Sequence, residues 1–152
     1  MGPIPPNQGR DWPTRTTLQT MTTISNLISA LIIVESSGND QAIGDNGRAL
    51  GPLQIHKAVV LDVNRITGSH YRHQDMTNRA QARAVCEAYL KHYVTEKRIG
   101  RKPTVADFAK VWNSGPEGFK KTCSDKYAAK VQLQTIKQND NHIEKRKAVP
   151  NR

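Results

Sequence analysis

The chain has 152 residues, of which 36% are hydrophobic and 5% aromatic, and 23 Lys and Arg against 13 Asp and Glu give a net charge of +10. This length suits one domain. No run approaches the roughly 18 apolar residues that a membrane span requires, so we expect no integral membrane segment. Two cysteines, Cys86 and Cys123, are too few for a disulfide scaffold, and the histidines lack metal-ligand spacing, so we expect no metal and no cofactor.

Both ends of the chain are polar. Residues 1–20 are rich in proline and polar residues without apolar periodicity, which predicts a flexible leader, and residues 137–152 predict a basic, polar tail. The apolar stretch 27–34 has no basic flank and runs into Glu35 rather than into a cleavage site, so it is no classical signal peptide. Without such a signal, we expect both cysteines to be reduced. The folded domain is therefore expected to span residues 21–136.

The apolar periodicity between the two ends is mostly helical. Helices are expected from Thr22 or Thr23 to near Gly38, over about 56–67, over 77–97 with Thr77 as its cap, from Thr104 to the stop at 114–116, and over 124–136. Short apolar pieces on either side of an Asp-Asn-Gly turn, within 41–55, predict a small β-hairpin. The fold class is therefore expected to be α+β, mostly helical with a small β-hairpin region.

Glu35 is the most informative single residue. It follows Ile28, Leu31 and Ile32 by seven, four and three positions, so it lies on the apolar face of its helix. A carboxyl group held against apolar side chains loses hydration, which raises its pKa, and such an acid is the proton donor that cleaves a glycosidic bond near neutral pH. The alternative is a helix-end glutamate that turns to water or pairs with Lys or Arg.

Three segments around this residue occur in a specific order: VESSG at 34–38, GPLQI at 51–55 and WNSGPEGFKK at 112–121, with DNG at 45–47 and a later Tyr127. Together they resemble the lysozyme-like superfamily. They are most similar to invertebrate-type lysozymes and their bacterial and phage relatives, and more distantly to soluble lytic transglycosylases. The resemblance covers about residues 30–132 and implies a lysozyme-like catalytic domain.

The resemblance assigns roles to six residues. It implies that Glu35 is the general acid and that Asp45 is the second carboxylate, as nucleophile or as stabiliser of the oxocarbenium-like state. It also implies substrate-binding roles for Ser36, which orients the acid or touches the sugar, and for Gln54, Trp112 and Asn113.

Besides the alternative for Glu35, the residues alone leave structural alternatives open for four more of these six. Asp45 suits an ordinary turn, Gln54 suits a role in satisfying a loop backbone group, Asn113 suits a helix C-cap, and Trp112 suits the core.

These roles predict a peptidoglycan-degrading glycosidase, a muramidase, that cleaves between N-acetylmuramic acid and N-acetylglucosamine. The alternatives are a lytic transglycosylase that leaves anhydro-muropeptides and a non-catalytic module that binds the cell wall or has a structural role. Bacterial cell walls are polyanionic, so the basic charge of the chain favours the cell wall as its partner through electrostatic steering. The chain lacks the patterns of nucleic-acid-binding modules, so we expect no nucleic-acid partner. We expect a monomer that is made in the cytoplasm and acts on glycan strands at the cell wall, as in phage-type lysis or within a virion.

Overall fold

A computed structural model describes the backbone of residues 15–148 and the side chains of residues 24–148. This part of the chain contains a two-stranded antiparallel sheet, β1 (Ile43–Gly44) and β2 (Ala49–Leu50), and six α-helices. The helices are α1 (Arg15–Ser36), α2 (Lys57–Thr67), α3 (Arg79–Tyr93), α4 (Glu96–Ile99), α5 (Val105–Ser114) and α6 (Asp125–Lys147). The predicted α+β class, mostly helical with one small hairpin, is confirmed.

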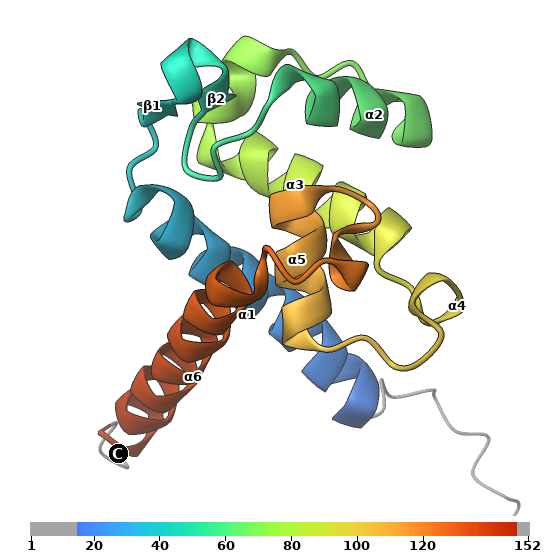
Figure 1. Ribbon diagram of the computed structural model, residues 1–152. Coiled ribbons are helices and arrows are strands. Elements are labelled where there is room, and N and C mark those ends of the chain that lie inside the picture. The colour runs from blue at the N-terminus through green and yellow to red at the C-terminus, as the bar shows by residue number, and fades with distance from the viewer. Residues whose placement is uncertain (1–14, 149–152) are drawn as a thin grey trace, which may run out of the picture.

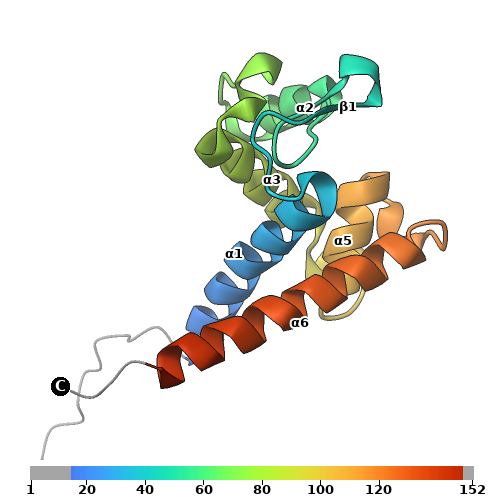
Figure 2. The same ribbon diagram turned by 90° about the vertical axis from the view of Figure 1, so that its left-hand side faces the viewer.

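The elements form two groups that α1 connects. Figures 1 and 2 show the hairpin, α2 and the start of α3 at one end of the molecule, and α5 and α6 at the other, with α1 running between them. Glu35 lies in the last turn of α1, where this helix reaches the hairpin group. The fold therefore places this carboxyl group at the junction of the two groups.

The core is built on the apolar stripe that the sequence predicts for α1. Leu27, Ile28, Leu31 and Ile32 are at most 2% exposed. They belong to one hydrophobic cluster, to which α3, α5 and α6 add further buried side chains (Val85, Leu90, Val111 and Val131). Burying each such aliphatic side chain contributes roughly 1.5–3 kcal/mol, so this cluster holds α1 firmly in place.

Both chain ends are more helical than the sequence predicts. Helix α1 begins at Arg15, so residues 15–20 of the expected flexible leader are helical, and residues 1–14 lie outside the described part. Helix α6 continues to Lys147, through most of the expected tail, and Asn26 of α1 donates a hydrogen bond to Asn139 of α6. Because extending an anchored helix costs much less than nucleating one, these polar turns continue the helices without an apolar stripe.

The third predicted helix is divided into two. Helix α3 ends at Tyr93, and α4 begins after a separate cap, Thr95, whose side chain accepts a hydrogen bond from the backbone N–H of Arg98. The cap of α3 is Asn78 rather than the predicted Thr77, because the Asn78 side chain accepts from the backbone N–H of Gln81 at 3.0 Å. Short polar side chains next to each other compete for this role, and local geometry decides between them.

Helix α5 begins after Thr104, as predicted, and its start is a capping box. Thr104 and Asp107 exchange hydrogen bonds between side chain and backbone. Asp107 is buried, which by itself raises its pKa, but hydrogen bonds from Arg101 and Thr104 lower the pKa below 3.8 on balance. The two cysteines form no disulfide: Cys86 is buried and Cys123 is exposed.

Among the described residues, none of the helices is both long enough and apolar enough to cross a bilayer.

Candidate active site

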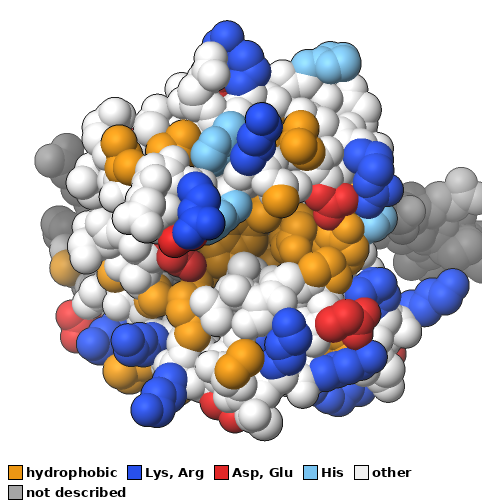
Figure 3. Space-filling view, turned by 45° about the horizontal axis from the view of Figure 1, so that its top comes forward, with side chains coloured by type: hydrophobic (Ala, Val, Ile, Leu, Met, Phe, Trp, Pro, Cys, Tyr) orange, Lys and Arg blue, Asp and Glu red, His pale blue; other side chains and the backbone are white. Residues whose placement is uncertain are grey.

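A cleft of about 320 Å³ lies where α1, the hairpin loop, α2 and α5 meet. It brings together five of the six predicted site residues, which are Glu35, Asp45, Gln54, Trp112 and Asn113. The rest of its lining comes from Ala49, Ile55, His56 and Val59. Figure 3 shows that this face of the molecule is hollowed, with apolar side chains on the floor and charged and histidine side chains at the rim.

The Glu35 carboxyl group is partly buried in this cleft. Burial raises its pKa above 4.5, and the hydrogen bond that the Tyr127 hydroxyl donates to Oε1, at 2.6 Å, opposes this rise without cancelling it. Within the described part of the chain, its side-chain partner is thus a neutral phenol and not the Lys or Arg of the alternative interpretation. A carboxyl group in this environment retains its proton to a higher pH than an ordinary glutamate.

Tyr127, the partner of Glu35, has no role among the six predicted site residues. It lies on α6, 92 positions after Glu35, and its ring belongs to the edge of the hydrophobic core. Burial and the neighbouring Glu35 charge raise the pKa of Tyr127, so its hydroxyl group remains a hydrogen-bond donor at all physiological pH values. Its place among the residues that carry the family resemblance is the signal in the sequence that points to it.

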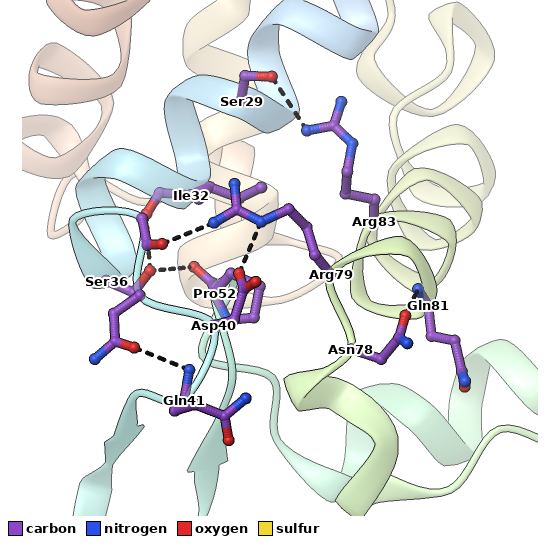
Figure 4. A network of polar contacts seen from close by, with 12 residues as sticks. Ser29, Ile32, Ser36, Asp40, Gln41, Pro52, Asn78, Arg79, Gln81 and Arg83 are labelled. Carbon is purple, nitrogen blue, oxygen red and sulfur yellow. Dashed lines mark hydrogen bonds and ion pairs between the residues drawn. The ribbon is translucent and has the colours of Figure 1, made fainter.

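The turn that carries Glu35 is tied to two other elements (Figure 4). Ser36 Oγ lies 2.8 Å from the Pro52 carbonyl oxygen and 3.1 Å from that of Ile32. Arg79 of α3 donates to Asp40 Oδ1 and to the Gly38 carbonyl oxygen, each at 2.7 Å.

Ser36 is not among the residues that line the cleft. Its contacts suit the first of its two predicted roles, orienting the acid, and not direct contact with substrate.

Asp45 lies at the mouth of the cleft in a strained turn. Its side chain is 46% exposed, and it pairs with Arg48 Nη2 at 3.0 Å and lies 3.4 Å from His56 Nε2. Asp45 and Asn46 both have positive φ, 50° and 55°, which short polar side chains tolerate. The residue therefore has the predicted turn role and also presents a carboxylate to the cleft.

Gln54 likewise combines a structural role with a position in the cleft. Its Nε2 donates to the carbonyl oxygens of Ala42 at 3.1 Å and Gly51 at 2.9 Å. Its Oε1 lies so close to Gly44 that a Cβ at this position would be 2.2 Å away. Because both amide protons are used by the loop, only Oε1 of this side chain remains to accept a hydrogen bond from a ligand.

The opposite wall is formed by the end of α5. Trp112 is half-buried, and its ring meets the Tyr89 ring edge-on with centroids 5.7 Å apart, so it belongs both to the core and to the cleft. Asn113 is exposed, and its Nδ2 donates to Ser124 Oγ at 3.1 Å, which leaves its carbonyl oxygen available. This arrangement offers an indole ring and a polar acceptor in one cleft, the mixture that small-molecule sites use.

Sequence reasoning did not place His56 and Val59 in the site. His56 is the N-cap residue of α2, Val59 lies in the first turn of this helix, and both line the cleft. The described residues include no group of three or more His, Cys, Asp or Glu side chains that could hold a metal ion. The cleft thus presents a partly buried acid, a second carboxylate flanked by Arg48 and His56, and several hydrogen-bonding groups.

Comparison of the sequence with models of known protein families and with curated proteins found no match.

Proposed function

We propose that the protein has a lysozyme-like fold and is a peptidoglycan-degrading glycosidase, a muramidase, with Glu35 as its general acid. The observation that carries this proposal is the position of the Glu35 carboxyl group, which is partly buried, bonded to Tyr127 and open to a cleft that also holds Asp45. The ordered segments that resemble the lysozyme-like superfamily support the same function. The net charge of +10 also supports the bacterial cell wall, which is polyanionic, as the partner.

The chemistry begins with the proton on Glu35. The acid gives this proton to the glycosidic oxygen while the bond from that oxygen to the sugar C1 breaks, and positive charge develops on the ring. Asp45 either stabilises this charge or attacks C1 to form a glycosyl-enzyme intermediate, and water completes the hydrolysis. Arg48 and His56 hold the Asp45 side chain in place during this step.

The substrate is oriented by the remaining cleft residues. The Trp112 ring provides a surface for one face of a sugar, and the free carbonyl oxygens of Gln54 and Asn113 accept hydrogen bonds from sugar hydroxyl or amide N–H groups. Tyr127 and Ser36 act through Glu35 and are positioning residues in this scheme.

A lytic transglycosylase is the second candidate, and the environment of Asp45 favours it. The Asp45 side chain is 46% exposed and already pairs with Arg48, whereas the Glu35 carboxyl group is partly buried and bonded to the neutral Tyr127 hydroxyl group. One carboxyl group suffices if the sugar's own hydroxyl group closes an anhydro ring. Mass spectrometry separates the two reactions, because anhydro products are lighter by one water than hydrolysis products.

The experiment is the release of soluble fragments from purified peptidoglycan by the parent protein and by Glu35→Gln. Glutamine keeps the shape of the side chain but has no acidic proton, so we expect a loss of roughly 10²–10⁴-fold or more. The matched control is Glu87→Gln on α3, whose carboxylate pairs with Lys91 outside the cleft, and it should retain full activity.

Two results would contradict the proposed enzymatic function. If folded Glu35→Gln releases fragments as fast as the parent, the role of Glu35 is wrong. If the parent protein binds purified walls but releases no new sugar ends, the chain is a non-catalytic wall-binding module.

A further inference from the structure

A second hollow, of about 420 Å³, lies beside the active-site cleft between β2, α2 and the segment 71–74. Its apolar lining includes Leu50, Leu61 and Tyr71, and the Leu61 side chain is 57% exposed. Lys57 and Arg72 bring positive charge to the same hollow. Apolar surface of this kind, next to two cations and outside the reaction site, suits a ligand that combines small apolar groups with carboxylates.

The two hollows share a wall. Strand β2 gives Ala49 to the cleft and Leu50 to the second hollow, and the start of α2 divides His56 and Lys57 in the same way. Ile55 lines the cleft, and its carbonyl oxygen accepts a hydrogen bond from His73 Nε2, at 2.7 Å, on the other side. A chemical group that is attached to a sugar in the cleft can therefore reach the second hollow by extending across this one wall.

The charges of the second hollow are not equally available. Arg72 donates two hydrogen bonds to Asp75, at 2.9 and 3.1 Å, so this carboxylate already neutralises much of its charge. Lys57 is exposed, and no ion pair among the described side chains uses its ammonium group. Lys57 is thus the cation that a carboxylate of a ligand would meet.

We propose that this second hollow binds the short acidic peptide that the muramic acid of peptidoglycan carries on its lactyl group. This inference rests on the proposed function, because that substrate brings such a peptide next to the cleft. The peptide alternates alanine methyl groups with free carboxylates, which match the apolar lining and Lys57 respectively. The site would make the protein prefer peptide-bearing strands over bare glycan.

The test is a titration of the synthetic tetrapeptide L-Ala-γ-D-Glu-meso-diaminopimelate-D-Ala into the isotopically labelled full chain, followed by amide NMR. We expect shifts at residues 57–61 and 71–74. Lys57→Glu should weaken binding about tenfold, since it replaces an attraction with a repulsion, and Lys57→Met should fall in between. Glutamate is favourable at the first position of a helix, so the variant should fold.

The matched control is Lys130→Glu, which makes the same charge change at an exposed position of α6. It should bind the tetrapeptide as the parent does. The proposal is wrong if the parent shows no shifts in the second hollow, or if Lys57→Glu and Lys130→Glu weaken binding equally.

A second arm separates this inference from the proposed function. Bare glycan strands, freed of peptide by an amidase, should be cleaved equally by the parent and by Lys57→Glu, because Lys57 does not line the cleft. Tetrapeptide binding without cleavage of any strand would contradict the glycosidase and leave the peptide site standing. Cleavage of strands without tetrapeptide binding would contradict the peptide site and leave the glycosidase standing.

Discussion

Removing the Tyr127 hydroxyl group tests how the protein sets the acidity of Glu35. Tyr127→Phe leaves the ring in the core but deletes the hydrogen bond to Oε1, whose length is 2.6 Å. A hydrogen bond to a charged group is worth about 1.5–3 kcal/mol, and this one favours the carboxylate over the carboxylic acid. Its loss should therefore raise the pKa of Glu35 further, since burial then acts without opposition.

The assay is the pH dependence of kcat/KM for fragment release from purified peptidoglycan. Activity requires protonated Glu35, so it falls as the pH rises through the Glu35 pKa, and this alkaline limb should move to higher pH in Tyr127→Phe. Tyr93→Phe is a matched control, because Tyr93 also donates to a carboxylate, Asp62, outside the cleft. An alkaline limb that stays in place or moves to lower pH in Tyr127→Phe would refute the reasoning.

Three further substitutions test how residues in and around the site affect the stability of the fold. Gly44→Ala should cost about 1–2 kcal/mol in urea unfolding and reduce fragment release, because its Cβ would displace Gln54 Oε1, 2.2 Å away, and so break the bonds of this amide to Ala42 and Gly51; unchanged stability would contradict this. Asp107→Ala should cost about 2 kcal/mol at pH 7, through loss of the cap and of the bonds from the half-exposed Arg101. Because the folded-state pKa of Asp107 is lowered, this cost should shrink as the pH falls below 3.8, and a pH-independent cost would be inconsistent. Glu35→Gln should stabilise the fold at pH 7, since burial disfavours the ionised carboxyl group, and the gain in thermal unfolding should vanish at acidic pH where Glu35 is protonated; a destabilised variant at pH 7 would oppose this.

Much of the fold could be predicted because its signals are local. The apolar stripe of α1, the helix start at Thr104 and the Asp-Asn-Gly turn each lie within a few residues of the structure they specify. The helical ends could not be predicted, because residues 15–20 and 137–147 have no apolar periodicity. Their helicity follows from continuation of anchored helices, which no local pattern encodes.

The site was predictable where one helix face or one turn defined it. Glu35 could be found from its spacing to three aliphatic residues, whereas its partner Tyr127 is 92 positions away and reaches it only through the packing of α6 on α1. The same limit applies to Ser36, whose bond to Pro52 depends on where the loop folds back. Long-range contacts decide which predicted residues face the cleft and which support it.

The most direct measurement of the central claim is a carboxyl ¹³C NMR titration of Glu35 in the full chain. The account predicts that this carboxyl group titrates above the ordinary value of 4.5 and that its pKa matches the alkaline limb of fragment release. A carboxyl group that titrates at or below 4.5 would be ionised throughout the neutral range, and Glu35 would then not be the proton donor.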